Sequence, residues 1–236
     1  MTAANMLFGF AAIINVFEAN FIAAGWLIII AGILDAFDGK IARKLNNSSI
    51  FGKEFDSLAD LISFGIAPAL LLYQIYFQQF GVFGILITFG YLLFGAYRLA
   101  RFNALTPVKA KKSAFSGLPI TVAGMAVASF VPFNMRIWGE MQMDLVLFPL
   151  VAALCLLMVS SITYDSFPRL TFRDGGSNTL QLIILILGLT LIILSPSLIF
   201  FPLCLIYIMQ GFIRSVIRTF KKQESSNAED YLTLIE

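Results

Sequence analysis

Long hydrophobic segments follow one another along almost the whole chain, separated by short polar connections. Each segment approaches the roughly 20 residues that an α-helix needs to cross a bilayer. The pattern therefore predicts an all-α fold, a polytopic bundle of transmembrane helices without a soluble module. The first segment is expected to remain as a helix, since no positive stretch precedes it and no small-residue cleavage site follows it. Eight spans are expected, at residues 3–18, 21–44, 54–79, 81–103, 115–135, 145–165, 179–195 and 197–218.

Composition supports a membrane protein and excludes several classes of function. Of the 236 residues, 59% are hydrophobic and only 13% are charged, whereas soluble domains carry about 25% charged residues. The net charge of +2 and the lack of a basic stripe give no reason to expect a nucleic-acid partner. The chain has no histidine, which excludes histidine bases and histidine-ligated metal sites. Cys155 and Cys204 lie in apolar segments and suggest core residues, not a disulfide.

Positive charges gather on one side of the predicted bundle. They follow the second, fourth, sixth and eighth spans, whereas only Arg136 falls on the opposite side. Cytoplasmic connections of membrane proteins are enriched in lysine and arginine. The bias predicts an integral protein of the cell membrane with both termini in the cytoplasm. The residues concerned are Arg43, Lys44, Lys53, Lys109, Lys111, Lys112, Arg169, Arg173, Arg214, Arg218, Lys221 and Lys222.

Four aspartates lie near the cytoplasmic surface, on the second and third predicted spans. Asp35 and Asp38 are three residues apart and Asp56 and Asp60 are four apart, so each pair shares one helix face. A charged side chain at membrane depth costs about 2.5–3.5 kcal/mol, and four carboxylates in one place also repel one another. Two divalent cations would balance the four negative charges. All-oxygen ligands favour Mg²⁺, Mn²⁺ or Ca²⁺, and such paired ions clamp phosphoryl groups during in-line displacement.

Two alternative roles of the four aspartates remain open. They could form the ion site of a cation-coupled transporter. Against transport, the acids lie near one surface, no inverted repeat is evident, and Glu18 is the only acid on the far side of the first spans. They could also simply pair with the basic residues Lys40, Arg43, Lys44 and Lys53.

Small and basic residues beside the aspartates suit a phosphate ligand. Gly39 has no side chain and Ala42 is small, so a phosphate group could approach the helix backbone there. Arg43 can bind phosphate oxygens through two parallel hydrogen bonds. Gly52 would relieve crowding where the next helix begins. For each small residue, the alternative is helix packing.

From Asp35 to Asp60 the chain reads D-x-x-D-G-x-x-A-R, eight further residues, and G-x-x-x-D-x-x-x-D. This signature resembles that of the CDP-alcohol phosphatidyltransferase family at every fixed position. The segments TAANMLFGFAAI, YRLARFN, FSGLPIT and LLMVSSITY resemble the integral-membrane phosphatidylserine synthases, apart from Thr121, where relatives often have a second proline. The resemblance implies a six-helix family core at residues 1–170. Two additional transmembrane helices are then expected within 171–218, followed by a mobile cytoplasmic tail at 219–236.

The resemblance also implies a reaction and roles for individual residues. The phosphatidyl group of CDP-diacylglycerol would pass to the hydroxyl of L-serine, giving phosphatidylserine and CMP, in a membrane-embedded homodimer. Asp60 would accept the proton of the serine hydroxyl. Two divalent cations, usually Mg²⁺ or Mn²⁺ with Ca²⁺ as a further occupant, would be held by Asp35, Asp38, Asp56 and Asp60. The CDP portion would be surrounded by Thr2, Asn5, Gly39, Ala42, Arg43, Ser49 and Gly52.

The carboxylate of a serine acceptor requires a cation at the membrane surface. Arg98 and Arg101 lie three residues apart at the cytoplasmic end of the fourth predicted span, and Asn103 could add a hydrogen bond. The alternative is that both arginines only anchor the helix at the membrane surface. Glycerol phosphate or inositol phosphate would suit the same charges, so these residues do not decide the acceptor.

Overall fold

The structure is a computed structural model that describes residues 2–45, 50–105, 115–142, 144–164 and 194–233. The predicted all-α fold is confirmed, with a single two-residue antiparallel ladder between β1 (Phe115–Ser116) and β2 (Thr163–Tyr164) in the described residues. The helices are α1 (Thr2–Phe17), α2 (Phe21–Leu45), α3 (Ile50–Asp60), η1 (Leu61–Ile66), α4 (Ala67–Ile75), η2 (Phe77–Phe80), α5 (Val82–Leu105), α6 (Ile120–Trp138), α7 (Asp144–Val159) and α9 (Pro196–Thr233).

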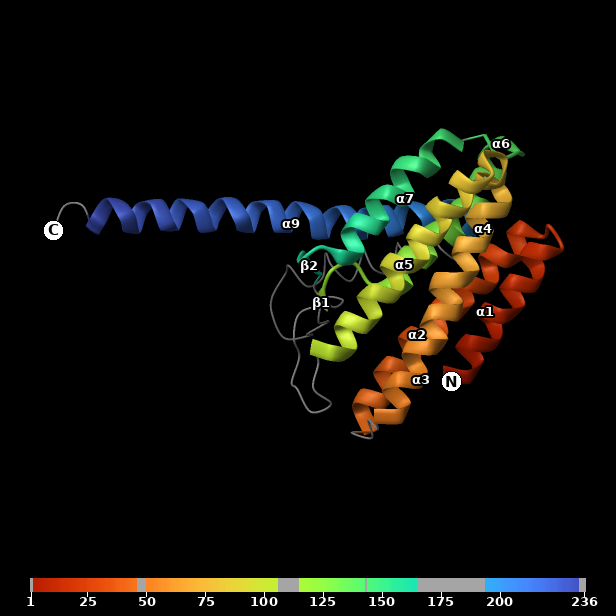
Figure 1. The fold of residues 1–236 in the computed structure, drawn as a ribbon, viewed down its shortest axis with the longest axis horizontal. Helices are drawn as coiled ribbons and strands as arrows, with labels where there is room; N and C mark the ends of the chain where they lie inside the picture. The colour runs from red at the N-terminus through yellow and green to blue at the C-terminus, as the bar shows by residue number, and fades with distance from the viewer. Residues whose placement is uncertain (1, 46–49, 106–114, 143, 165–193, 234–236) are drawn as a thin grey trace.

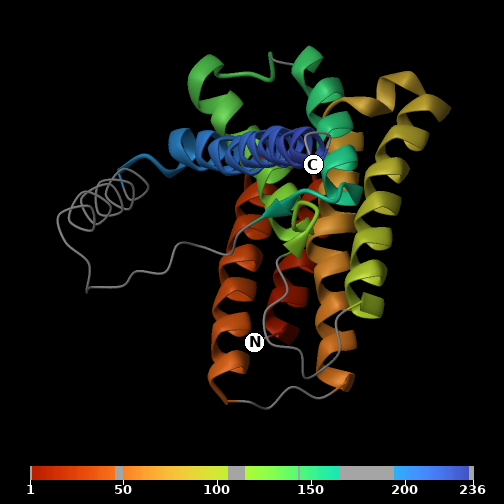
Figure 2. The same ribbon diagram turned by 90° about the vertical axis from the view of Figure 1, so that its left-hand side faces the viewer.

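Helices α1 to α7 form a bundle through which α3, η1 and α4 run as one continuous helix (Figure 1). The N-terminus, the end of α2, the start of α3 and the end of α5 lie toward the same end of the bundle. Helix α9 packs against α6, crosses the bundle helices at a steep angle and extends beyond them (Figures 1 and 2). The direction of α9 therefore sets it apart from the bundle.

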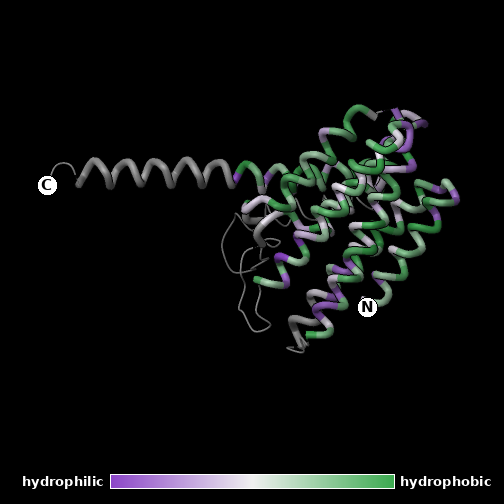
Figure 3. Tube along the Cα trace, viewed as in Figure 1, coloured by the Kyte–Doolittle hydropathy of each residue, from purple (hydrophilic) through white to green (hydrophobic). Residues whose placement is uncertain are grey.

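The helices have the lengths and composition of membrane spans. Hydrophobic stretches run along the bundle helices, and hydrophilic stretches lie mainly toward their ends (Figure 3). Two shorter apolar helices, Thr2–Phe17 and Leu145–Val159, accompany the longer ones. The protein is thus a polytopic membrane protein. Five described stretches are long and apolar enough to cross a bilayer, namely Phe21–Gly39, Ile50–Ile75, Val82–Leu105, Ile120–Trp138 and Pro196–Arg214.

Several helix ends differ from the predicted boundaries. The fifth predicted span begins at Ile120 instead of 115, because the preceding residues form β1 and a turn in which Gly117 has a φ of +85°. The sixth ends at Val159 because the chain then enters β2. The last helix continues to Thr233, past the expected end at residue 218. The seventh predicted span, 179–195, lies almost wholly outside the described residues.

Glycines allow the helices that carry the site to approach closely. A Cβ atom on Gly25 of α2 would lie 2.6 Å from the carbonyl oxygen of Ala128 in α6. A Cβ atom on Gly124 of α6 would lie 2.8 Å from Cβ of Phe64 in η1. Small residues at such contacts are typical of membrane helix packing, because they let backbones come together. These contacts bring α2, η1 and α6 together beside the aspartates.

Candidate active site

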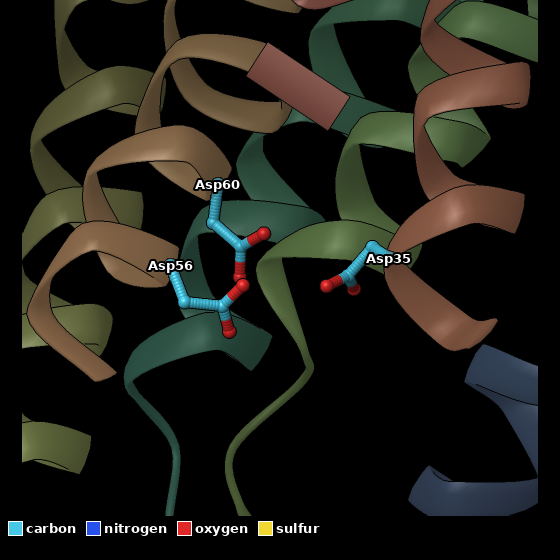
Figure 4. Close-up of side chains that lie close together, drawn as sticks. All are labelled: Asp35, Asp56 and Asp60. Carbon is cyan, nitrogen blue, oxygen red and sulfur yellow. The ribbon is translucent and has the colours of Figure 1, made fainter. Parts of the chain in front are cut away.

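Three of the four predicted aspartates meet between two helices. Asp56 and Asp60 lie one turn apart on α3, and Asp35 faces them from α2 (Figure 4). One carboxylate oxygen from each residue lies within 4.8 Å of the other two. The helix spacing therefore predicted correctly that the two acid-bearing faces would come together.

The repulsion within this cluster is larger than its hydrogen bonds can offset. Two like charges 4.8 Å apart repel by about 3.5 kcal/mol at an effective dielectric constant near 20. A hydrogen bond to an ionised carboxylate contributes about 1.5–3 kcal/mol, less than the repulsion within one such pair of charges. Three ionised carboxylates at this separation consequently favour a nearby cation. The donor set, which is all oxygen in a chain without histidine, fits a hard divalent ion.

The first turns of α1 supply polar partners to the acids. The hydroxyl of Thr2 lies 3.4 Å from Oδ2 of Asp38 and 3.5 Å from Oδ1 of Asp56. A hydroxyl has one hydrogen to donate, so Thr2 serves one of these carboxylates at a time. Nδ2 of Asn5 donates to Oδ1 of Asp60 at 3.3 Å. Thr2 thereby links Asp38, which is outside the 4.8 Å group, to the other acids.

Asn5 also has an unused acceptor at the site. Its side chain is completely buried, and its Oδ1 has no hydrogen-bond partner among the described residues. A buried polar atom without a partner costs about 1–3 kcal/mol, and such atoms in folded proteins often face a ligand or ion. The predicted involvement of Asn5 in the site fits this position.

Thr121 is a site residue that the sequence pattern does not identify. Its hydroxyl donates to Oδ2 of Asp35 at 3.3 Å from the first turn of α6. By sequence alone, Thr121 is only a departure from the family pattern. The Gly117 turn and Pro119, the residue that precedes α6, place its hydroxyl at Asp35. No local pattern could have revealed this contact, because the two residues are 86 positions apart.

Arg98 is the one buried cation in the described part of the chain. The side chain is only 6% exposed, and its charge interacts with those of Asp60 and Asp35. Its guanidinium carbon lies 5.9 Å from the centre of the Phe102 ring. The buried Nε has no hydrogen-bond partner among the described residues. Arg98 therefore offers an unused donor on a side chain whose charge interacts with that of the catalytic candidate Asp60.

Arg101 has a different environment from Arg98. Its Nη1 and Nη2 donate to the carbonyl oxygens of Val159 and Ser160 at 2.7 and 3.1 Å. These carbonyls end α7, so Arg101 ties α5 to α7 beside the turn that leads into α6. The described contacts of Arg101 thus belong to the helix junction.

Asn103 joins α5 to α3. Its Nδ2 donates to Ser57 at 2.9 Å and to Glu54 at 3.1 Å, whereas its buried Oδ1 has no partner among the described residues. Lys53 donates to the backbone carbonyl of Asn103 at 3.0 Å and lies 5.6 Å from the centre of the Phe102 ring. Lys53, one of the cations considered as a partner of the aspartates, therefore makes these contacts with α5.

The remaining predicted residues are only partly described. Gly39 follows Asp38 on α2, Gly52 precedes Asp56 on α3, and both glycines are exposed. Ser49 lies outside the described residues, as do the side chains of Ala42 and Arg43. Their assignments to the CDP portion stay predictions.

Comparisons with known proteins place the chain among phosphatidyltransferases. A family model described as CDP-alcohol phosphatidyltransferase matches residues 1–194. A CDP-diacylglycerol–serine O-phosphatidyltransferase of Helicobacter pylori is 35% identical over 215 residues, which cover 90% of this chain and 88% of the relative. A protein of the same name from Methanocaldococcus jannaschii is 34% identical over 80% of this chain and 83% of its own length. An archaetidylserine synthase of Methanothermobacter thermautotrophicus is 37% identical over 72% of this chain and 68% of its own length.

Proposed function

The chain belongs to the CDP-alcohol phosphatidyltransferase family, and on that premise we propose that it transfers the phosphatidyl group of CDP-diacylglycerol to L-serine, giving phosphatidylserine and CMP. The observation that carries the proposal is the meeting of Asp35, Asp56 and Asp60 within 4.8 Å, inside the family's signature. The names of the relatives support serine as the acceptor.

The proposed roles of the acids follow from their chemistry. A serine hydroxyl is a poor nucleophile, and a carboxylate within hydrogen-bond reach can accept its proton as the new bond to phosphorus forms. We assign this role to Asp60, which Asn5 holds through its side-chain amide. Asp35, Asp38, Asp56 and Asp60 would hold two divalent cations, Mg²⁺ or Mn²⁺. When bound, such ions supply Lewis-acid chemistry that withdraws charge from a pyrophosphate and makes CMP a better leaving group.

Recognition of serine is assigned to Arg98 and Asn103. The unused Nε donor of the buried Arg98 suits the serine carboxylate. The unused Oδ1 acceptor of Asn103 suits the serine ammonium group. Arg101, which shares the helix spacing of Arg98, would support this pocket by holding α5 against α7.

The CDP portion would lie on the exposed side of the acid cluster. Its proposed contacts are those of the signature and of the first helix, namely Thr2, Asn5, Gly39, Ala42, Arg43, Ser49 and Gly52. The bias of positive residues toward one side supports a cytoplasmic location for this end of the bundle and for both termini. The acyl chains can then stay in the lipid while serine arrives from water. A homodimer is proposed on the family resemblance.

Two other acceptors belong to the same proposal as alternatives, glycerol phosphate and inositol phosphate. Both carry anionic groups that Arg98 could bind, so only a direct comparison of acceptors separates them. Cation transport has less support, because the chain belongs to a family of transferases.

The metal requirement tests the mechanism. Purified protein in lipid vesicles receives CDP-diacylglycerol, L-serine and Mn²⁺ or Mg²⁺, and CMP and phosphatidylserine are quantified. We expect both products only with a divalent ion, and none after a chelator is added. Undiminished product in chelator would contradict the two-metal mechanism.

A further inference from the structure

The helix that carries Asp56 and Asp60 changes its winding directly after Asp60. Residues Leu61–Ile66 form a π-helical turn, η1, in which the amide of Ala67 donates to the carbonyl of Ile62, five residues earlier. In an α-helix the donor would lie four residues later than the acceptor. A π turn is rare and holds one extra residue compared with an α turn.

Pro68 gives a chemical reason for this change. In a regular α-helix the amide of residue 68 would donate to the carbonyl oxygen of Phe64. Proline has no amide hydrogen, so an α-helical path would leave that carbonyl without its donor. The site is dry, since Phe64 is completely buried and Pro68 is buried too. A carbonyl at this depth requires a partner from elsewhere in the protein.

Tyr91 supplies that partner from the neighbouring helix α5. Its hydroxyl donates to the carbonyl oxygen of Phe64 at 3.0 Å, and its side chain is completely buried. A second contact holds the turn on its other side, where the Ser63 hydroxyl donates to the backbone carbonyl of Asn5 at 3.0 Å. The π turn is therefore fixed by hydrogen bonds that link it to two different helices.

The extra residue changes the direction in which the acids point. Each α-helical residue turns by about 100°, so eight residues of regular helix would leave Asp60 about 80° away from the line of Pro68. One extra residue in the turn removes about 100° and brings Asp60 to within about 20° of that line. The buried residues of α4 are Ala67, Pro68, Ala69, Leu71 and Leu72, so Pro68 lies at the centre of its buried face. The π turn thus moves Asp60, and Asp56 one turn earlier, from the edge of this buried face toward its centre.

We propose that Pro68 and Tyr91 are positioning residues for the acid cluster: Pro68 disfavours a regular helix and Tyr91 stabilises the π turn that directs Asp56 and Asp60 toward Asp35. The inference rests on the proposed function, because it concerns carboxylates that would hold divalent ions. Pro68 and Tyr91 are buried and lie outside the family's signature, yet under this proposal they orient two of its acids.

The test combines Tyr91→Phe, Pro68→Ala and the double variant in the full-length protein. Tyr73→Phe is the matched control, since it removes a tyrosine hydroxyl from a half-buried position on α4 away from η1. Mn²⁺ is titrated into each purified protein without substrates, and the free ion is measured by its electron paramagnetic resonance signal. Thermal unfolding midpoints are recorded for the same proteins without metal.

We expect Tyr91→Phe to weaken Mn²⁺ binding about three- to tenfold and to lower the unfolding midpoint, while Tyr73→Phe changes neither. Pro68→Ala should weaken Mn²⁺ binding as well, because the amide introduced at position 68 competes with Tyr91 for the carbonyl of Phe64. In the Pro68→Ala variant, Tyr91→Phe should no longer lower the thermal unfolding midpoint, because the carbonyl of Phe64 then has the amide of residue 68 as its donor. The two changes would then be clearly non-additive.

Two results would overturn the inference: Mn²⁺ binding by Tyr91→Phe equal to that of the control, or midpoint losses that simply add in the double variant. Failure of the proposed function would give a different experimental result. If the parent protein binds no Mn²⁺, the metal site and the aiming role are both wrong, whereas the midpoints still decide whether Tyr91 and Pro68 act on the same carbonyl.

Discussion

Replacing either arginine at the end of α5 by lysine should affect a different property. We expect Arg98→Lys to raise the KM for serine and Arg101→Lys to lower the thermal stability. Arg98→Lys keeps a positive charge near Asp60 and Asp35 but removes Nε and the planar guanidinium group. Arg101→Lys removes the pair of hydrogen bonds to Val159 and Ser160. If only Arg98 receives the serine carboxylate, only its replacement should raise the concentration of serine needed for half-maximal rate.

The expected size of the effect follows from the burial of Arg98. The side chain is 6% exposed, so a contact between its unused donor and a carboxylate would be shielded from water. A hydrogen bond to a charged group contributes about 1.5–3 kcal/mol, which corresponds to roughly a ten- to hundredfold change in affinity. Lysine can still offer one donor, so we expect about tenfold in KM for Arg98→Lys and a value nearer a hundredfold for Arg98→Ala.

The assay measures CMP release against serine concentration at saturating CDP-diacylglycerol, and then against CDP-diacylglycerol at saturating serine. For Arg101→Lys we expect a lower thermal stability with a serine KM within about twofold of the parent. Ethanolamine, which lacks the carboxylate, should be a poor acceptor for the parent and should lose nothing further in Arg98→Lys. A normal serine KM in Arg98→Lys, or an equal increase in Arg101→Lys, would refute the assignment of the carboxylate to Arg98.

Three further substitutions test other parts of the site. Asp56→Asn, which removes a charge and keeps the size, should abolish turnover and greatly weaken Mn²⁺ binding; activity near that of the parent would rule out a shared carboxylate site. Thr121→Val removes the hydroxyl that contacts Asp35, so we expect a loss of Mn²⁺ affinity of about tenfold, as for other groups that orient metal ligands, with recovery in Thr121→Ser. Arg43→Lys should raise the KM for CDP-diacylglycerol more than that for serine, because a point charge replaces a bidentate donor; an effect confined to serine would show that Arg43 binds the other substrate.

The features that the sequence could predict are those encoded by local spacing. Asp56 and Asp60 share a face because residues four apart on a helix do so, and Asp35 could be expected to face them across a short connection. The hydrophobic segments likewise predicted the bundle helices. The all-α membrane fold and the core of the acid cluster therefore followed from periodicity alone.

The features that could not be predicted depend on packing between distant segments. The hydroxyl of Thr121 finds Asp35 only because Gly25 and Gly124 let α6 approach α2 and η1 closely. Arg101 looked equivalent to Arg98 because both follow the same helix spacing, yet its guanidinium contacts the end of α7. These contacts depend on how the helices pack together, which no single segment of the sequence specifies.

The identity of the acceptor is the most direct test of the function as a whole. The purified protein is given CDP-diacylglycerol, Mn²⁺ and, in separate reactions, isotope-labelled L-serine, glycerol phosphate or inositol phosphate, with Asp60→Asn as the matched inactive control. We predict labelled phosphatidylserine and one CMP for each lipid formed with serine, little product with the two phosphorylated acceptors, and none with the control. Rapid product formation from glycerol phosphate or inositol phosphate, with serine left unused, would contradict the proposal that this protein is a serine phosphatidyltransferase.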